Sequence, residues 1–120
     1  MGQRLGMKVT VTVGTGYDRD LTRMDDYDTK LMTEEALTEL TFEFGGATVT
    51  RGTGSWQNPK SKLIVQERVN IFTVFTVDQD PDVPEKVAKF LNNKFDQENV
   101  LVEVIYFDTL GSNQAFIYPQ

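Results

Sequence analysis

The sequence contains no cysteine and no histidine among its 120 residues. Without cysteine the chain has no disulfide, no thiolate nucleophile and no thiolate metal site. Without histidine it has no imidazole base and no serine–histidine triad. Any enzyme built on this chain must therefore use Asp, Glu, Lys or Tyr as its acid or base, and any bound metal would need oxygen ligands.

Positive charge and long apolar runs are also scarce. The chain has 12 Lys and Arg against 18 Asp and Glu, which gives a net charge of −6. An acidic chain repels phosphate backbones, so duplex nucleic acid is not an expected partner. No apolar run approaches the roughly 20 residues that span a bilayer, and the first residues lack the apolar core of a signal peptide. We expect a cytoplasmic protein with no membrane partner.

The length predicts one domain over residues 1–120. Residues 1–6 are expected to be flexible, and residues 107–120 to form a tail. The apolar residues of the tail at 115–118 either add a short strand or pack against a partner. The acidic segment 17–30 is predicted to be an exposed loop, either mobile or functional, because its length is unusual for a compact domain.

Hydrophobic periodicity predicts four strands and two helices. Val9, Val11 and Val13 alternate with polar residues, which is typical of a half-buried strand. Thr33 is expected to cap the first helix, which ends at Gly45. The predicted elements are strands at 7–13, 47–51, 63–77 and 100–106, and helices at 33–44 and 83–95.

The order β-α-β-β-α-β indicates an α+β protein. It is typical of a ferredoxin-like sandwich, in which two helices cover one face of a four-stranded antiparallel sheet. That fold supports many functions, so function has to be argued from particular residues.

Several motifs along the chain resemble those of a known family. They are, in order, Phe44-Gly-Gly-Ala-Thr-Val49, Gly52-x-Gly54-x-Trp56, Leu63-x-x-x-Glu67 and Phe95-Asp-Gln-Glu-Asn-Val-Leu101. In order and spacing they are similar to the uncharacterised bacterial family known as domain of unknown function 3574 and its short phage-encoded relatives. The resemblance covers most of residues 7–105 and implies the same fold, with no established activity. The acidic loop and the tail depart from the family pattern.

Three segments that could bind a cofactor or a metal are incomplete motifs. Neither Gly14-x-Gly16 nor Gly52-x-Gly54 extends to the G-x-G-x-x-G of a phosphate-binding loop. The run Asp78-x-Asp80-x-Asp82 begins like a calcium loop but lacks the required Gly and the final Glu. We therefore expect no cofactor and no metal site.

Four residues are candidates for ligand binding. Trp56, the only tryptophan, could stack on a base or a sugar, or could cover the edge of the core. Arg51 and Glu67 could take part in the same site, or could pair across a hairpin. Glu67 and Arg68 are neighbours on a strand and should point to opposite faces. Gln97 lies between a helix and a strand, where it could contact a ligand or cap the backbone.

One face of the sheet is predicted to remain uncovered by the helices. If Phe72, Val74, Leu101 and Ile105 lie on it, they form an apolar patch large enough to indicate a partner, most simply a second copy of the chain. Alternatively, the tail folds over this face.

These features favour a small acidic binding or interaction module without enzymatic activity. We expect it to be phage-encoded and to act as a homo-oligomer that blocks a host protein or sequesters a small ligand. The alternative is a small enzyme that uses carboxylates, Tyr or Arg at a cleft between subunits. Whether the chain is an enzyme stays open at this point.

Overall fold

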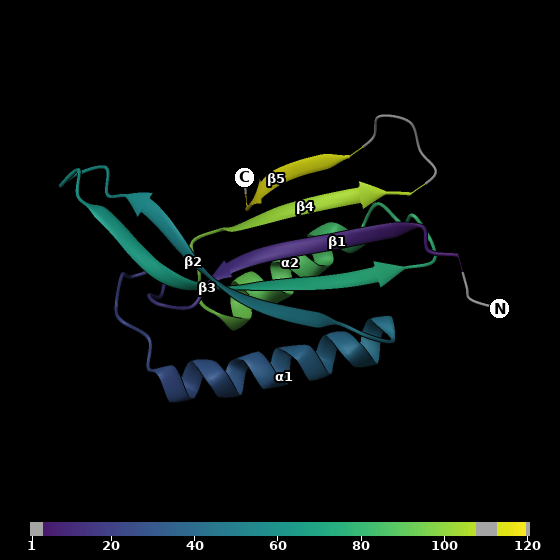
Figure 1. The fold of residues 1–120 in the computed structure, drawn as a ribbon, viewed down its shortest axis with the longest axis horizontal. Helices are drawn as coiled ribbons and strands as arrows, with labels where there is room; N and C mark the ends of the chain where they lie inside the picture. The colour runs from purple at the N-terminus through teal and green to yellow at the C-terminus, as the bar shows by residue number, and fades with distance from the viewer. Residues whose placement is uncertain (1–3, 108–112, 120) are drawn as a thin grey trace.

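The computed structural model describes residues 4–107 and 113–119. Residues 1–3 of the segment expected to be flexible, and residues 108–112 and 120 of the tail, lie outside the described part. The elements are β1 (Met7–Gly14), α1 (Asp26–Phe44), β2 (Thr48–Gln57), β3 (Ile64–Thr76), α2 (Val83–Lys94), β4 (Val100–Tyr106) and β5 (Gln114–Tyr118) (Figure 1). Neither described helix has the length and apolar character needed to cross a bilayer.

The sheet has five antiparallel strands in the order β2-β3-β1-β4-β5. The first six elements follow the predicted order β-α-β-β-α-β, so the α+β class is confirmed. The sheet has one strand more than the four predicted, because the tail adds β5 beside β4, which was one of the two alternatives for this segment. Phe116 pairs with Val102, and Tyr118 pairs with Val100. Both aromatic side chains pack against the core, and this packing explains why so short a segment joins the sheet.

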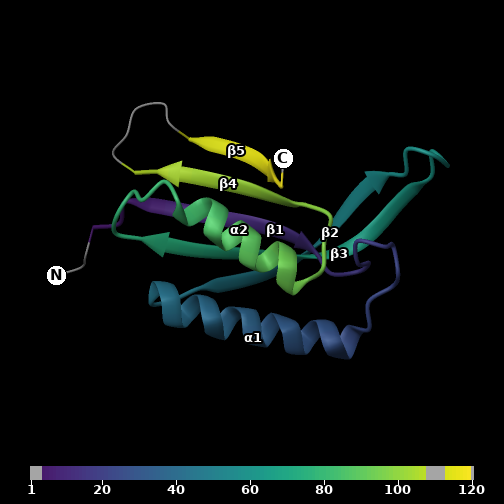
Figure 2. The ribbon, with the colours of Figure 1, turned by 180° about the vertical axis from the view of Figure 1, so that it is seen from behind.

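Both helices pack on the same face of the sheet (Figure 2). Val9, Val11 and Val13 are fully buried there, as their alternation predicted. Ala36 and Leu40 of α1, together with Val87 and Leu91 of α2, complete the core from the helix side. The opposite side of the sheet, which carries Thr10 and Thr12 of β1, is called the open face below.

Only two of the four residues expected on the uncovered face of the sheet lie there. Phe72 pairs with Val11 and Val74 pairs with Val9, and residues paired across antiparallel strands point to the same side. Phe72 and Val74 are therefore buried against the helices, with 1% of each exposed. Leu101 and Ile105 do lie on the open face, where 39% of each remains exposed.

Helix α1 begins seven residues before the predicted cap, at Asp26 instead of Thr33. The N-cap is Asp25, whose carboxylate accepts hydrogen bonds from the backbone N–H groups of Tyr27 and Asp28. Thr33 is buried within the helix and donates to the Thr29 carbonyl. The first turns carry no apolar stripe because they are largely exposed, so periodicity did not reveal them.

The end of α1 depends on Gly45, as predicted. This residue has φ 82°, in the left-handed region, and its N–H donates to the Thr41 carbonyl. We expect Gly45→Ala to lower the free energy of unfolding by about 1 kcal/mol, because a Cβ strains this conformation. Gly46→Ala is the matched control, since Gly46 lacks a positive φ and has open space around its Cα. Urea denaturation of both variants measures the difference, and an equal loss in the two would contradict this explanation.

Candidate active site

The loop between β1 and α1 folds back over the end of the sheet. Thr15 donates from its backbone N–H to the Arg68 carbonyl at 2.9 Å, which fixes the start of the loop on β3. Arg19 forms an ion pair with Asp96 at 2.5 Å, which fixes the middle of the loop beside the end of α2. The loop is thus held by contacts to two distant parts of the chain, and its beginning helps to build a cavity.

Glu67 lies under this loop, on β3 opposite the end of β1. The carboxylate passes so close to Gly14 that a Cβ on this glycine would stand 2.7 Å from Glu67 Oε1. The same Cβ would stand 2.7 Å from Gln97 Oε1. Gly14 is therefore needed for close approach, because any side chain there would displace the two functional groups that meet at this point.

The Glu67 carboxylate has an unsatisfied oxygen. Its Oε2 is buried, and it has no hydrogen-bond partner among the described residues. Burial raises the pKa of Glu67 above its usual value of 4.5, while the backbone amides of Tyr17 and Gly16 act in the opposite direction. A buried oxygen without a partner is costly, and a cationic or hydrogen-donating ligand group would remove that cost.

Gln97 is the second polar group of the site, and 8% of it is exposed. Its Nε2 donates to the Tyr17 carbonyl at 2.7 Å and to the Phe95 carbonyl at 2.9 Å. These bonds direct Oε1 of the amide toward Gly14 and Glu67. Gln97 thus binds backbone carbonyls, as one of its two interpretations predicted, and it also lines the cavity, while its contact with a ligand stays a prediction.

A cavity of about 370 Å³ opens beside these groups. Trp56 and Tyr17, two half-buried aromatic residues, line it together with Glu67 and Gln97. The volume falls within the range of small-molecule sites, and the combination of aromatic surface with a few oriented polar groups is typical of such sites. The arrangement is suited to a planar aromatic ligand that also carries a positive charge.

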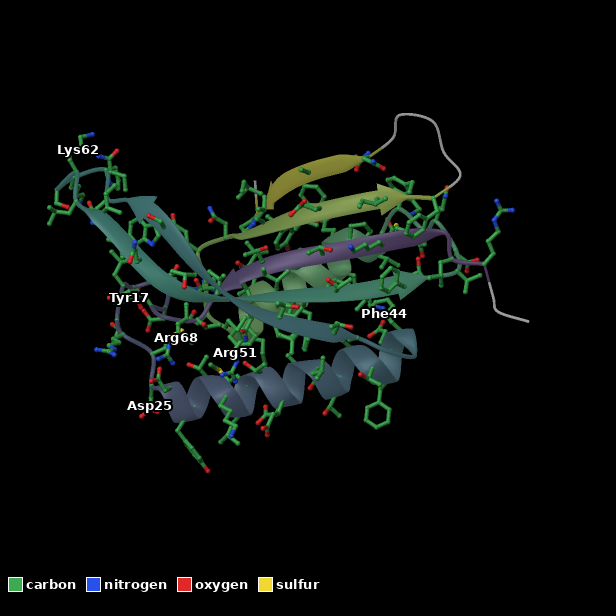
Figure 3. The ribbon with its side chains drawn as sticks, viewed as in Figure 1. Tyr17, Asp25, Phe44, Arg51, Lys62 and Arg68 are labelled. Carbon is green, nitrogen blue, oxygen red and sulfur yellow. The ribbon has the colours of Figure 1, made fainter. Side chains whose placement is uncertain are left out.

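The structure brings together three of the four predicted site residues. Trp56, Glu67 and Gln97 share this cavity, whereas Arg51 lines another cavity on the helix side of the sheet. Figure 3 shows Arg51 and Arg68 between the sheet and α1. The two arginines are on the helix side because they belong to the set of strand residues that alternates with Glu67. No pairing between Arg51 and Glu67 is therefore formed.

Sequence reasoning missed Tyr17 as a site residue. It was grouped with the acidic loop, where the surrounding aspartates suggested solvent exposure. The available signal was the position of Tyr17 directly after a strand and two glycines, where the chain can turn back over the sheet.

No family model matches the chain, and no curated protein matches it. Its fold is similar to solved structures of a phage S-adenosylmethionine (SAM) lyase. In complex with S-methyl-5′-thioadenosine, that lyase matches with a TM-score of 0.66 and 16% identity, over 97% of this chain and 95% of the lyase. The apo lyase matches with a TM-score of 0.66 and 14% identity, over 100% and 98%. CutA from Synechococcus elongatus matches with a TM-score of 0.52 and 8% identity, over 88% and 80%.

This likeness contradicts our expectation of a binding module without enzymatic activity. Two of the similar structures are those of a lyase, and they cover nearly the whole chain. The expectation rested on the absence of histidine and cysteine and on incomplete cofactor and metal motifs, and none of these features excludes an enzyme that uses other residues. The expected membership of the domain of unknown function 3574 family stays a prediction.

The raised pKa of Glu67 predicts a specific pH dependence of stability. A carboxyl whose folded pKa exceeds its unfolded value stabilises the fold below that unfolded value and loses this contribution as the pH rises through the folded pKa. Glu67→Gln removes the titration. We therefore expect the free energy of unfolding of the wild type, relative to this variant, to fall as the pH rises from about 4 to 8.

Urea denaturation of both proteins at several pH values measures this difference. Glu34→Gln is the control, because Glu34 is an exposed residue of α1. If the free energy of unfolding of the wild type, relative to Glu67→Gln, instead rose with pH, the prediction would be wrong. The fold would then stabilise the Glu67 carboxylate as an anion.

Proposed function

We propose that the chain is a SAM lyase that releases S-methyl-5′-thioadenosine. The observation that carries the proposal is the buried, unpartnered carboxylate oxygen of Glu67 in a cavity with aromatic walls. The likeness in fold to the phage lyase supplies the substrate class. The substrate has an adenine ring, a sulfonium cation and an amino-acid group, and the cavity offers features that match the ring and the amino-acid group.

The aromatic walls suit the adenine ring. Trp56 and Tyr17 both line the cavity, and stacking of a base on such side chains is worth about 1–3 kcal/mol. The acceptor Oε1 of Gln97 lies within the site for an N–H or O–H group of the ligand.

The Glu67 carboxylate suits the α-ammonium group of the substrate. A carboxylate placed on the sulfonium would stabilise the ground state more than the transition state, because the sulfonium charge disappears as the bond breaks. The ammonium charge persists throughout the reaction. An ion pair between Glu67 and the ammonium therefore orients the amino-acid group without opposing the chemistry.

The proposed reaction requires no proton transfer. A carboxylate oxygen of the substrate bonds to its own Cγ, the bond from Cγ to sulfur breaks, and the electron pair of that bond goes to sulfur. The products are S-methyl-5′-thioadenosine and homoserine lactone, and the total charge is unchanged. A chain without histidine and cysteine can promote this reaction by positioning alone.

Incubation of the purified protein with SAM tests the proposal. We expect S-methyl-5′-thioadenosine and homoserine lactone to form in equal amounts, as detected by liquid chromatography and mass spectrometry. A parallel incubation without protein measures the rate at which SAM breaks down spontaneously. Product formation no faster than this background would overturn the proposal, and an open-chain unsaturated amino acid in place of the lactone would overturn the proposed route.

We also propose that the chain acts as a homo-oligomer. The support is the open face, where Phe75, Leu101, Ile105 and Ile117 leave large apolar side chains exposed. Analytical ultracentrifugation at micromolar concentration tests this proposal, and a monomer would contradict it.

A further inference from the structure

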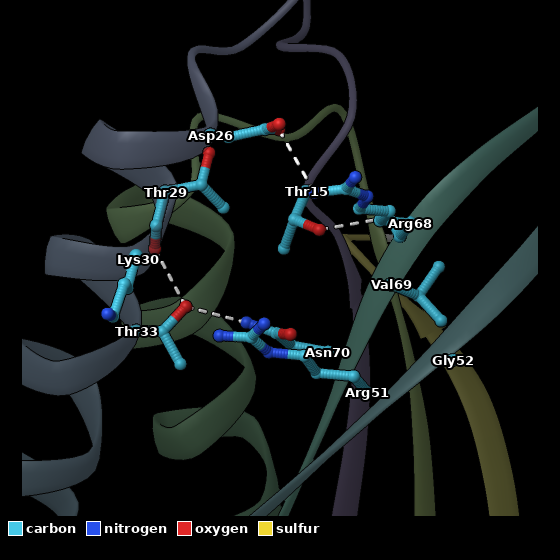
Figure 4. Close-up of a pocket in the computed structure, with 10 residues that line it drawn as sticks. All are labelled: Thr15, Asp26, Thr29, Lys30, Thr33, Arg51, Gly52, Arg68, Val69 and Asn70. Atoms are coloured by element: carbon cyan, nitrogen blue, oxygen red, sulfur yellow. Dashed lines mark hydrogen bonds and ion pairs between the residues drawn. The ribbon is translucent and has the colours of Figure 1, made fainter.

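A second cavity lies on the other side of the sheet from Glu67, between α1 and the strands β2 and β3 (Figure 4). It has a volume of about 220 Å³. Its inner wall is polar and buried, since Thr15, Thr33 and Asn70 are exposed by 5%, 7% and 4%. The charged side chains Lys30 and Arg51 also line it. Polar and charged side chains thus make up most of the residues that line the cavity, with Val69 among the exceptions.

The buried polar groups hold one another in place. Asn70 Nδ2 donates to Thr33 Oγ1 at 2.7 Å, and the Thr33 hydroxyl donates to the Thr29 carbonyl at 2.7 Å. The Thr15 hydroxyl donates to the Arg68 carbonyl at 3.1 Å. Because these hydroxyl donors are already used, a ligand would meet chiefly the charged donors of the cavity.

The charge of the cavity is opposite to that of the protein. Lys30, Arg51 and Arg68 contribute three positive charges and Asp26 one negative charge, which gives +2 in a chain of net charge −6. Arg68 is paired with Asp26 at 3.2 Å. Lys30 and Arg51 form no ion pair with any residue that the structure describes. An acidic protein with 18 carboxylate side chains thus leaves these two cations available to a ligand.

We propose that this cavity binds a small oxyanion through Arg51 and Lys30. The guanidinium of Arg51 offers two parallel N–H donors that match a carboxylate or a phosphate, and Lys30 adds a point charge from α1. The volume suits an inorganic phosphate or a small dicarboxylate. The inference goes beyond the proposed lyase activity, because it requires neither SAM nor Glu67.

The anion site is connected to the candidate active site through neighbouring residues of the chain. Arg68, which lines the anion cavity, follows Glu67 directly on β3, and its carbonyl accepts both bonds from Thr15. Thr15 in turn lies between Gly14 and Gly16, at each of which an added Cβ would meet the Glu67 side chain. A ligand that reorients Arg68 or Thr15 would therefore act on the segment that covers the Glu67 carboxylate.

Titration with inorganic phosphate, and separately with malonate, tests the proposal. Binding is followed by amide NMR at constant ionic strength, set with sodium chloride. We expect saturable shifts at Thr33 and Asn70 with at least one of the two anions. Stronger binding of phosphate identifies a phosphate ligand, and stronger binding of malonate identifies a carboxylate ligand.

Arg51→Gln is expected to weaken this binding by at least about tenfold, since it removes the paired donors. Lys60→Gln is the matched control, because it removes the same charge at the exposed tip of the β2–β3 hairpin. Lys30→Gln provides a second test on another element and should also weaken binding. Equal affinities in Arg51→Gln and Lys60→Gln, or the absence of saturable shifts at Thr33 and Asn70 with both anions, would overturn the proposal.

Discussion

Replacing Glu67 by glutamine is expected to lower kcat/KM for SAM by about 10- to 100-fold. The substitution keeps the shape of the side chain and removes its negative charge. A hydrogen bond to a charged group contributes about 1.5–3 kcal/mol, which corresponds to this range of rates. Because the ion pair with the ammonium exists in the ground state and in the transition state, the larger part of the change should be a rise in KM.

Two comparisons make this prediction specific to Glu67. Glu34→Gln removes the same charge from an exposed position on α1, and its kcat/KM should equal that of the wild type. If Glu67 were instead a base that removes a proton from the substrate, kcat itself would fall by about 10²- to 10⁴-fold at unchanged KM. That result would refute the positioning role assigned to this carboxylate. The assay therefore separates two chemical roles of one residue.

The candidate site was partly predictable from the sequence because strand alternation separates neighbouring side chains. Glu67 and Arg68 were expected on opposite faces, and Glu67 does lie under Gly14 while Arg68 reaches Asp26 of α1. The same alternation applied to β2 would have separated Arg51 from Trp56, which lie an odd number of positions apart. Tyr17 could not be found this way, because the path of a loop depends on distant contacts such as those of Arg19 with Asp96.

The fold was predictable wherever apolar residues recur with a clear period. The alternating valines predicted β1 correctly, and the apolar residues at helical spacing predicted α2. Burial on one face imposes such a pattern on the sequence. The start of α1 was missed because exposed helical turns have no apolar stripe, and their stability comes from the Asp25 cap. The sequence did not decide whether the tail forms a strand. Five residues are too few to show a clear alternation, and the pairing with β4 cannot be seen in the sequence.

The faces of β3 lead to the largest expected change in stability. Both faces of this strand carry apolar residues, so its sequence alone did not decide whether Phe72 or Phe75 points to the helices. The pairing with β1 places Phe72 on the helix side, because Phe72 lies opposite the buried Val11. Phe72 is 1% exposed and its ring lies 5.9 Å from that of Phe95, centroid to centroid, whereas Phe75 is 40% exposed. Truncation of the two phenylalanines should therefore have very different effects.

Phe72→Ala is expected to lower the free energy of unfolding by about 3–5 kcal/mol, because it leaves a cavity that the surrounding core cannot fill. Phe75→Ala, three positions along the same strand, should cost about 1 kcal/mol, since its ring already meets solvent on the open face. Urea denaturation at low protein concentration measures both values. Equal losses at low concentration would contradict the register, whereas a loss in Phe75→Ala that grows with protein concentration would show that a second copy covers the open face.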